Sequence, residues 1–459
     1  MRIFDCVAWL IILNLALYFK TLRYKFVSDD FTIWKNPPVA KNRFHKTWLQ
    51  FTGQMKFYCD SVRFVQANGK NYVALVKSEE FEHFLTILIH ICICVSIYFA
   101  FGASWVSFVA ALLYATNPVN NQGTIWPAGR GYALPILSLL LSVCIPLLSP
   151  VLLLFCTWYT IGFHGVLGLV GTEKWYLLAM VPIFWLWWGR KFKKAVTFKS
   201  STESFDQDRR YDLSKVVVAI KTFGFYLTLC LIPFRITFYH NFLQSLGGSW
   251  AKRWHSVWDR YFWIGIAGIA GVIYYVPTHW GQPLAQILIA YLITTIPYCN
   301  IYRANQEIAE RFCALPNVFL MVALAHFIAL YPVIIAAFLI FYATRTYYTL
   351  LQYKDEYFIT EVAIVEDPHA WWAWHCRAMK RWDTQSYREA LILWVMAKLI
   401  SPKEFKLLIN IASCLRLLGN NEEADQYLQA AEANIVAGQE KEAYEFIAQH
   451  RKGKLPILL

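Results

Sequence analysis

Charged residues are scarce in this chain. Asp, Glu, Lys and Arg together make up 16% of its 459 residues, whereas soluble domains contain roughly a quarter. Hydrophobic residues reach 58% and aromatic residues 17%. This balance excludes an ordinary soluble globular protein and predicts an integral membrane protein.

Cysteine motifs and nucleic-acid-binding patterns are also missing. The 11 cysteines contain no CxxC pair, and the spacing of Cys92 and Cys94 suits neither a metal site nor a disulfide. The formal net charge is +13, but no basic patch interleaved with aromatic residues accompanies it. We therefore expect the basic residues to meet lipid headgroups and anionic ligands rather than nucleic acid. No metal site is evident.

Long apolar runs recur along most of the chain. The first, around Leu10–Leu17, has no small-residue cleavage site after it, so it is interpreted as a membrane helix rather than a signal peptide. Because a spanning helix needs about 20 apolar residues, the sequence predicts about eleven membrane helices. They are expected near residues 4–22, 82–101, 104–116, 131–147, 150–168, 175–189, 216–236, 261–277, 283–299, 313–328 and 331–347.

The predicted fold class is all-α, with a polytopic transmembrane domain over residues 1–352. The connector Arg190–Lys221 holds nine Lys or Arg against four Asp or Glu, which places it in the cytoplasm by the positive-inside rule. With eleven spans, the amino terminus is then cytoplasmic and the carboxy-terminal domain extracytoplasmic, in a bacterial inner membrane or the endoplasmic reticulum. The basic residues of 20–25 favour the reverse orientation. Residues 23–80 are predicted to form an extracytoplasmic loop with interfacial helices.

Residues 353–459 have the composition of a soluble helical domain with a 34-residue repeat. Ala390 and Ala424 are 34 residues apart, as are Ala397 and Ala431, and Pro402 lies where a tetratricopeptide repeat normally has its proline. We predict two such repeats and a capping helix near 439–450, which together present a concave surface to a partner. A generic pair of helical hairpins is the alternative.

Two adjacent carboxylates, Asp29 and Asp30, follow the first apolar run. An ionised Asp at a membrane boundary has to be solvated, paired or used, because its burial in lipid costs several kcal/mol. One interpretation makes this pair the chemical centre. The other makes it, with Ser28, a solvated turn or helix cap.

Several arginines are predicted on the same side of the membrane as the two carboxylates. Arg130 opens a helix whose free backbone N–H groups suit a phosphate, although a charged helix anchor has the same pattern. Arg235, Arg303 and Arg311 lie in two further polar stretches, and Glu310 either joins them or pairs with Arg311. Such arginines would stabilise a departing lipid phosphate, while one carboxylate takes the proton of an acceptor hydroxyl.

Two histidines, His83 and His90, are seven residues apart and share one helical face. No carboxylate or cysteine completes a metal-binding set around them. We expect hydrogen-bonded core histidines rather than ligands.

Three motifs, in this order along the chain, resemble those of one family. The stretch Phe26–Asp30, followed by Asn36-Pro37, resembles a first-loop acidic motif, and Phe81-Glu82-His83 with His90 resembles a His-containing second helix. Residues 309–316 resemble an AER-x-x-x-LP motif. The chain is thus similar to the multi-pass GT-C glycosyltransferases with carboxy-terminal tetratricopeptide repeats, such as the transmembrane O-mannosyltransferases of that type.

The resemblance implies roles for individual residues. Asp30, or else Asp29, would be the catalytic carboxylate, and Arg311 with Glu310 would belong to the donor-site loop. Arg130 matches the arginine after the family's HPxHTE segment. Residues 117–122 keep the proline of that segment but replace both His and the Glu with amides, which puts any acid–base or metal role there in doubt.

The function implied by the resemblance is transfer of a sugar from a polyprenyl-phosphate carrier to a hydroxyl, with Ser or Thr of a protein as the expected acceptor. Its partners would be this lipid-linked sugar, the surrounding membrane lipids and a protein bound by the repeats. One alternative is a catalytically decayed scaffold that recruits a partner through the repeats. Another is a transporter or polymerase of lipid-linked glycans.

Overall fold

The computed structural model describes residues 2–25, 27, 63–67, 70–74, 79–158, 166, 168–172, 213–238, 258–300, 308–366, 368, 370–402, 404–435 and 440–451. α-Helices form most of this part of the chain, so the predicted helical class is confirmed. It is extended by one antiparallel hairpin, formed by β1 (Arg63–Ala67) and β2 (Lys70–Ala74).

The hairpin lies within residues 23–80, most of which are outside the described residues, so the extracytoplasmic loop with interfacial helices stays a prediction there. Arg63 pairs with Ala74, and Ala67 pairs with Lys70. In the sequence the two strands flank Asn68-Gly69, and this dipeptide is the strongest short-range signal for a hairpin turn. The sequence therefore contains a local signal for the two strands, beside the aromatic and basic residues from which interfacial helices were predicted.

Apolar helices occupy all the predicted spans except 175–189, which lies outside the described residues.

Five segments are long and apolar enough to cross a membrane: Ile3–Arg23, Glu79–Ala100, Pro127–Cys144, Arg260–Thr278 and Pro332–Tyr353. The helices in them are α1 (Ile3–Tyr18), α4 (Glu79–Ala100), α7 (Arg130–Cys144), α13 (Arg260–Thr278) and α16 (Pro332–Leu350). Shorter apolar helices are α5 (Trp105–Thr116), α8 (Ser149–Trp158), α11 (Leu213–Leu231), α14 (Pro283–Thr295) and α15 (Ala314–Ile328). The total of eleven spans stays a prediction.

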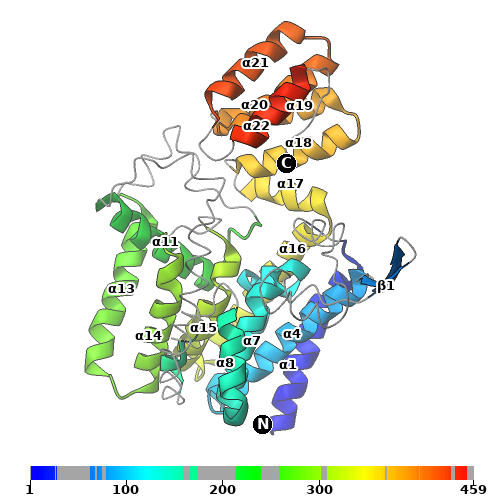
Figure 1. The fold of residues 1–459 in the computed structure, drawn as a ribbon. Coiled ribbons are helices and arrows are strands. Elements are labelled where there is room, and N and C mark those ends of the chain that lie inside the picture. Colours follow the sequence, from blue (N-terminus) through cyan, green and yellow to red (C-terminus); the bar gives the residue numbers. More distant parts are fainter. Residues whose placement is uncertain are drawn as a thin grey trace.

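The apolar helices, long and short, share one core, to which α1, α4, α5, α7, α11, α14 and α15 all contribute. Figure 1 shows the amino terminus at one end of these helices and the carboxy-terminal helices α17–α22 beyond the other end. A smaller apolar cluster joins the two parts, because Tyr18, Trp126, Phe238 and Tyr353 pack there with Ile359 of α17 (Glu356–Glu366).

The carboxy-terminal helices repeat with the predicted period. Trp371, which starts α18 (Trp371–Asp383), and Phe405, which starts α20 (Phe405–Leu417), are 34 residues apart. The same interval separates the starts of α19 (Tyr387–Ile400) and α21 (Asn421–Ala433). The four alanines that carry the predicted repeat are buried in a separate core, and α22 (Glu440–Arg451) occupies the place expected for a capping helix. The tetratricopeptide assignment and the boundary at residue 352 stay predictions.

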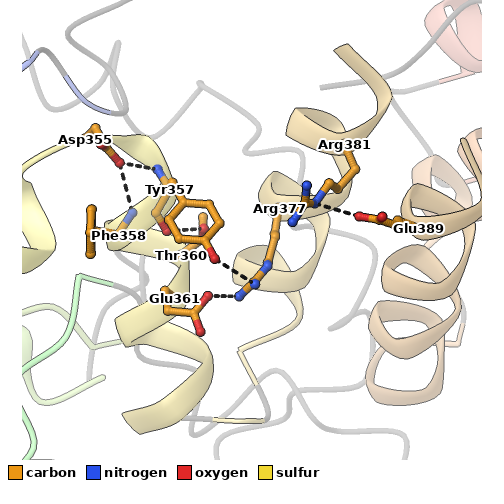
Figure 2. Close-up of polar contacts among 8 residues, drawn as sticks. All are labelled: Asp355, Tyr357, Phe358, Thr360, Glu361, Arg377, Arg381 and Glu389. Carbon is orange, nitrogen blue, oxygen red and sulfur yellow. Dashed lines mark hydrogen bonds and ion pairs between the residues drawn. The ribbon is translucent and has the colours of Figure 1, made fainter. Parts of the chain in front are cut away.

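Polar contacts fix α17 against the first repeat (Figure 2). The Asp355 carboxylate caps α17 by accepting from the backbone N–H of Tyr357 (2.9 Å) and of Phe358 (3.1 Å). Arg377 of α18 pairs with Glu361 and donates to the Tyr357 hydroxyl at 3.3 Å. Arg381 pairs with Glu389 of α19 at 3.0 Å.

The turns inside the two helix pairs have the same backbone geometry. Gln385 has φ +60° and Gly419, 34 residues later, has φ +89°. In each turn the next N–H donates to a carbonyl five residues back, Ser386 to Arg381 (2.9 Å) and Asn420 to Leu415 (2.8 Å). Only the second turn has the glycine that this left-handed conformation favours.

We expect Gly419→Ala to destabilise the second helix pair by about 1 kcal/mol, because a side chain in the left-handed region is strained. Gln385→Gly at the equivalent position should have no such cost. Hydrogen exchange of α18–α21 peptides in the solubilised full chain measures both. Equal loss of protection in the two variants would contradict this reading of the turns.

Candidate functional site

Three segments that are far apart in the sequence meet at the end of the helices nearest α17. They are residues 117–130, 235–238 and 308–312. Figure 1 shows this end of α4, α7 and α16 facing α17. Every residue from 113 to 130 is buried, so the polar turn expected outside the membrane is enclosed by protein. The turn consists of short helical pieces, namely a 3₁₀ turn (Pro118–Asn120), α6 (Asn121–Thr124) and a second 3₁₀ turn (Pro127–Gly129).

The amides of this turn bind neighbouring helices. Asn117 Nδ2 donates to the Cys230 carbonyl at 2.7 Å. Asn120 Oδ1 accepts from Asn317 of α15 at 3.2 Å, and Asn121 Nδ2 donates to the Thr349 hydroxyl of α16 at 2.7 Å. Uncharged amides can form such buried hydrogen bonds without the desolvation cost of ions. These side chains therefore hold the site together rather than supply acid–base chemistry.

Arg130 is the first residue of α7, as predicted, but its guanidinium is already engaged. It pairs with the Glu82 carboxylate of α4, and its Nε donates to the Pro127 carbonyl at 3.0 Å. Both side chains of the pair are buried. Gly129 lets the start of α7 lie close to the backbone of Gln122, because a Cβ there would lie 2.1 Å from the Gln122 carbonyl oxygen. The predicted phosphate-binding role of Arg130 has no support from this geometry and stays a prediction.

Glu310 and Arg311 turn to different partners. The Glu310 carboxyl accepts from the backbone N–H of Thr237, and Arg311 Nη1 donates to Gln122 Oε1 at 3.3 Å. The Arg311 guanidinium also faces the rings of Trp126 at 5.6 Å and Tyr132 at 5.5 Å. One of the two sequence interpretations was that Glu310 pairs with Arg311. The structure describes both residues and does not show this ion pair.

Burial raises the pKa of the Glu310 carboxyl well above its usual range. The hydrogen bond from Thr237 and the charges of Arg311 and Arg345 oppose the shift but are smaller effects than desolvation. The burial of Glu310 therefore favours the uncharged form of its carboxyl.

The segment 233–238 is held by side chains that the sequence interpretation did not single out. Arg345 of α16 donates to the Pro233 carbonyl at 3.1 Å, and Gln352 Oε1 accepts from the Phe238 N–H at 3.2 Å. Arg235, one of the predicted phosphate ligands, is exposed to solvent. Glu82 was noticed only within a motif. Neither Glu82 nor Arg345 had a sequence signal for its partner, since each contact joins distant parts of the chain.

The chain that leads to Asp29 and Asp30 is hydrogen-bonded to two residues of this region, Lys354 and Trp126. The Lys25 N–H donates to the Lys354 carbonyl at 3.1 Å, and Trp126 Nε1 donates to the Val27 carbonyl at 3.3 Å. Asp29, Asp30 and Arg303 lie outside the described residues.

Both histidines of α4 are core residues. His83 Nδ1 is 2.8 Å from the Ile125 carbonyl, and His90 stacks on Tyr114 with its ring edge-on to Tyr18. Within the described ranges, no group of three metal-ligating side chains occurs.

Comparison of the chain with protein-family models, with curated proteins and with solved structures gives no match. The resemblance to GT-C glycosyltransferases therefore rests on the sequence motifs alone.

We expect Arg130→Gln to destabilise the protein by about 3–5 kcal/mol, because it leaves the buried Glu82 charge without its counter-ion. Adding Glu82→Gln should recover much of the loss. Thermal unfolding in detergent measures this, with Arg381→Gln in the exposed pair as a control that costs at most about 1 kcal/mol. Similar small effects for Arg130→Gln and Arg381→Gln would argue against a structural role of the buried pair.

The raised pKa of the Glu310 carboxyl predicts a pH dependence of stability. Its folded-state pKa lies above the unfolded value, so the folded state retains a proton that the unfolded state loses, and stability falls as pH rises between the two values. Glu310→Gln keeps an acceptor for Thr237 and should remove this contribution, raising the melting temperature at pH 8 more than at pH 5. The exposed Glu389→Gln serves as a control. Parallel pH profiles for the parent and Glu310→Gln would exclude a raised pKa.

Proposed function

We propose that this protein is a membrane glycosyltransferase of the GT-C type. It would transfer a sugar from a polyprenyl-phosphate carrier to a hydroxyl, with Ser or Thr of a protein as the acceptor. The observation that carries the proposal is that Trp126 contacts both Arg311 and the chain that leads to Asp29 and Asp30. Trp126 joins them, because its indole N–H binds the Val27 carbonyl while its ring faces the Arg311 guanidinium.

The proposed chemistry divides two tasks between these groups. The Asp30 carboxylate takes the proton of the acceptor hydroxyl as the hydroxyl oxygen bonds to the anomeric carbon of the sugar. The bond between that carbon and the phosphate oxygen breaks, and the lipid phosphate leaves with the bonding electrons. The positive charge of Arg311 stabilises the phosphate as its negative charge grows. A lipid-linked donor suits a site at the ends of apolar helices.

The arrangement also supports the proposed topology. The amino terminus lies at one end of the long helices, and the candidate site and α17–α22 lie at the other (Figure 1). An odd number of spans, with a cytoplasmic amino terminus and an extracytoplasmic site, would produce this arrangement. The repeats then lie on the same side as the site, where a protein acceptor would bind.

The competing proposal is a scaffold whose site has lost its chemistry. Two observations favour it, namely the pairing of Arg130 with Glu82 and the capture of Glu310 by the Thr237 N–H. Both groups are used by the protein itself. If the parent protein transfers no sugar from any polyprenyl-phosphate donor offered to it, the scaffold is the better explanation.

We expect Asp30→Asn to reduce sugar transfer at least about 100-fold, because general-base catalysis contributes typically 10²–10⁴-fold. Transfer from labelled polyprenyl-phosphate sugars to peptide acceptors measures it, with the full chain in lipid vesicles. Asp383→Asn, on the exposed end of α18, is the matched control and should transfer normally. Unchanged transfer in both Asp30→Asn and Asp29→Asn would rule out the base role of this pair.

A further inference from the structure

Arg311 is a buried cation with a neutral partner. Only 8% of the residue is exposed, and its one hydrogen bond, from Nη1, goes to the side-chain oxygen of Gln122. Its other neighbours are the rings of Trp126, Tyr132 and Phe312, with centroids 5.4 to 5.6 Å away. No carboxylate of the described residues forms an ion pair with it. Arg130 differs, because Glu82 compensates its charge.

Unused hydrogen-bond donors accompany this charge. In the described part of the chain, Arg311 Nε is buried without a hydrogen-bond acceptor, and Gln122 Nε2, which lies beside the Tyr353 hydroxyl, makes no hydrogen bond of normal geometry. Native structures rarely leave buried donors without partners, and a buried cation without a counter-ion is especially costly. The two groups together require an acceptor with several oxygen atoms and a negative charge.

The neighbouring acid cannot meet this requirement. The Glu310 carboxyl accepts from the Thr237 N–H and, although the structure describes both residues, forms no ion pair with Arg311. Gln122 itself supplies an amide oxygen, which orients the guanidinium but leaves its charge uncompensated. A glutamate of the same shape at position 122 would neutralise Arg311 instead.

We propose that Arg311 and Gln122 form an anion site for a phosphate group and that the neutral amide of Gln122 keeps this site open. The phosphate is either the headgroup of a lipid phosphate or a free phosphate. The lipid source rests on the proposed glycosyltransferase function, whereas the anion site itself does not. Arg130 takes no part in binding the anion, because its guanidinium is committed to Glu82.

Binding of defined probes to the solubilised full chain tests the proposal. The probes are farnesyl phosphate, inorganic phosphate and the uncharged alcohol farnesol, and a shift of thermal unfolding reports binding. We expect the parent to bind a phosphate probe and not farnesol. Gln122→Glu should bind at least about tenfold more weakly, because the new carboxylate pairs with Arg311. Arg311→Gln should lose binding to a similar degree.

Gln282→Glu is the matched control, since it makes the same chemical change on an exposed turn between α13 and α14. Binding of farnesyl phosphate alone identifies a lipid headgroup, and equal binding of inorganic phosphate identifies a free phosphate. The proposal is overturned if the parent binds neither phosphate probe, or if Gln122→Glu binds as tightly as Gln282→Glu. If Gln122→Glu does not fold, undiminished binding by Arg311→Gln overturns it equally.

The outcome separates this site from the proposed reaction. Asp30→Asn should bind the phosphate probe like the parent, because the carboxylate acts on the acceptor. Loss of binding in Gln122→Glu together with unchanged transfer in Asp30→Asn would retain the anion site and reject the base role. The reverse pair of results would reject the anion site alone.

Discussion

The structure depends on one buried polar turn, residues 117–130, which lies among the ends of the apolar helices. A turn without regular hydrogen bonding is tolerated at such a place only where protein surrounds it and satisfies its polar groups. Asn117, Asn120 and Asn121 meet this requirement by binding α11, α15 and α16. The same bonds fix the ends of these helices relative to one another. The site therefore rests on a frame in which these three amide side chains are hydrogen-bonded without net charge.

Within this frame, the two buried arginines are stabilised in different ways. Arg130 has a carboxylate partner, Glu82, and the pair is electrically neutral. Arg311 has an amide and aromatic rings, which attract a guanidinium but leave its charge in place. Arg130 is thus paired within the protein, whereas Arg311 has no carboxylate partner among the described residues. Sequence alone ranked the two arginines equally, because both lie in polar stretches beside a helix start.

Features with a short period in the sequence were predictable, and contacts between distant segments were not. Hydropathy located the apolar helices, and alanines 34 residues apart located the repeated helix pairs, since both patterns come from packing between near neighbours. The strands β1 and β2 also had a local signal, the Asn68-Gly69 dipeptide that lies between them in the sequence. By contrast, the partners of Arg130, Gln122 and Glu310 lie 48 or more residues away in the sequence. No periodicity encodes such distances, so the convergence of Arg130, Arg311 and Glu310 emerged only in three dimensions.

The charge of Arg311 also bears on the choice between enzyme and scaffold. Replacing buried charged groups with apolar residues of similar volume is often neutral or stabilising, so architecture alone gives no reason for a guanidinium here. The surrounding rings of Trp126, Tyr132 and Phe312 attract the guanidinium but do not neutralise its charge. A buried cation that faces a neutral amide and unused donors is better explained by a bound anion. We therefore favour a site that still binds an anion over one that has decayed, and the proposed anion would lie near Trp126, which also binds the Val27 carbonyl.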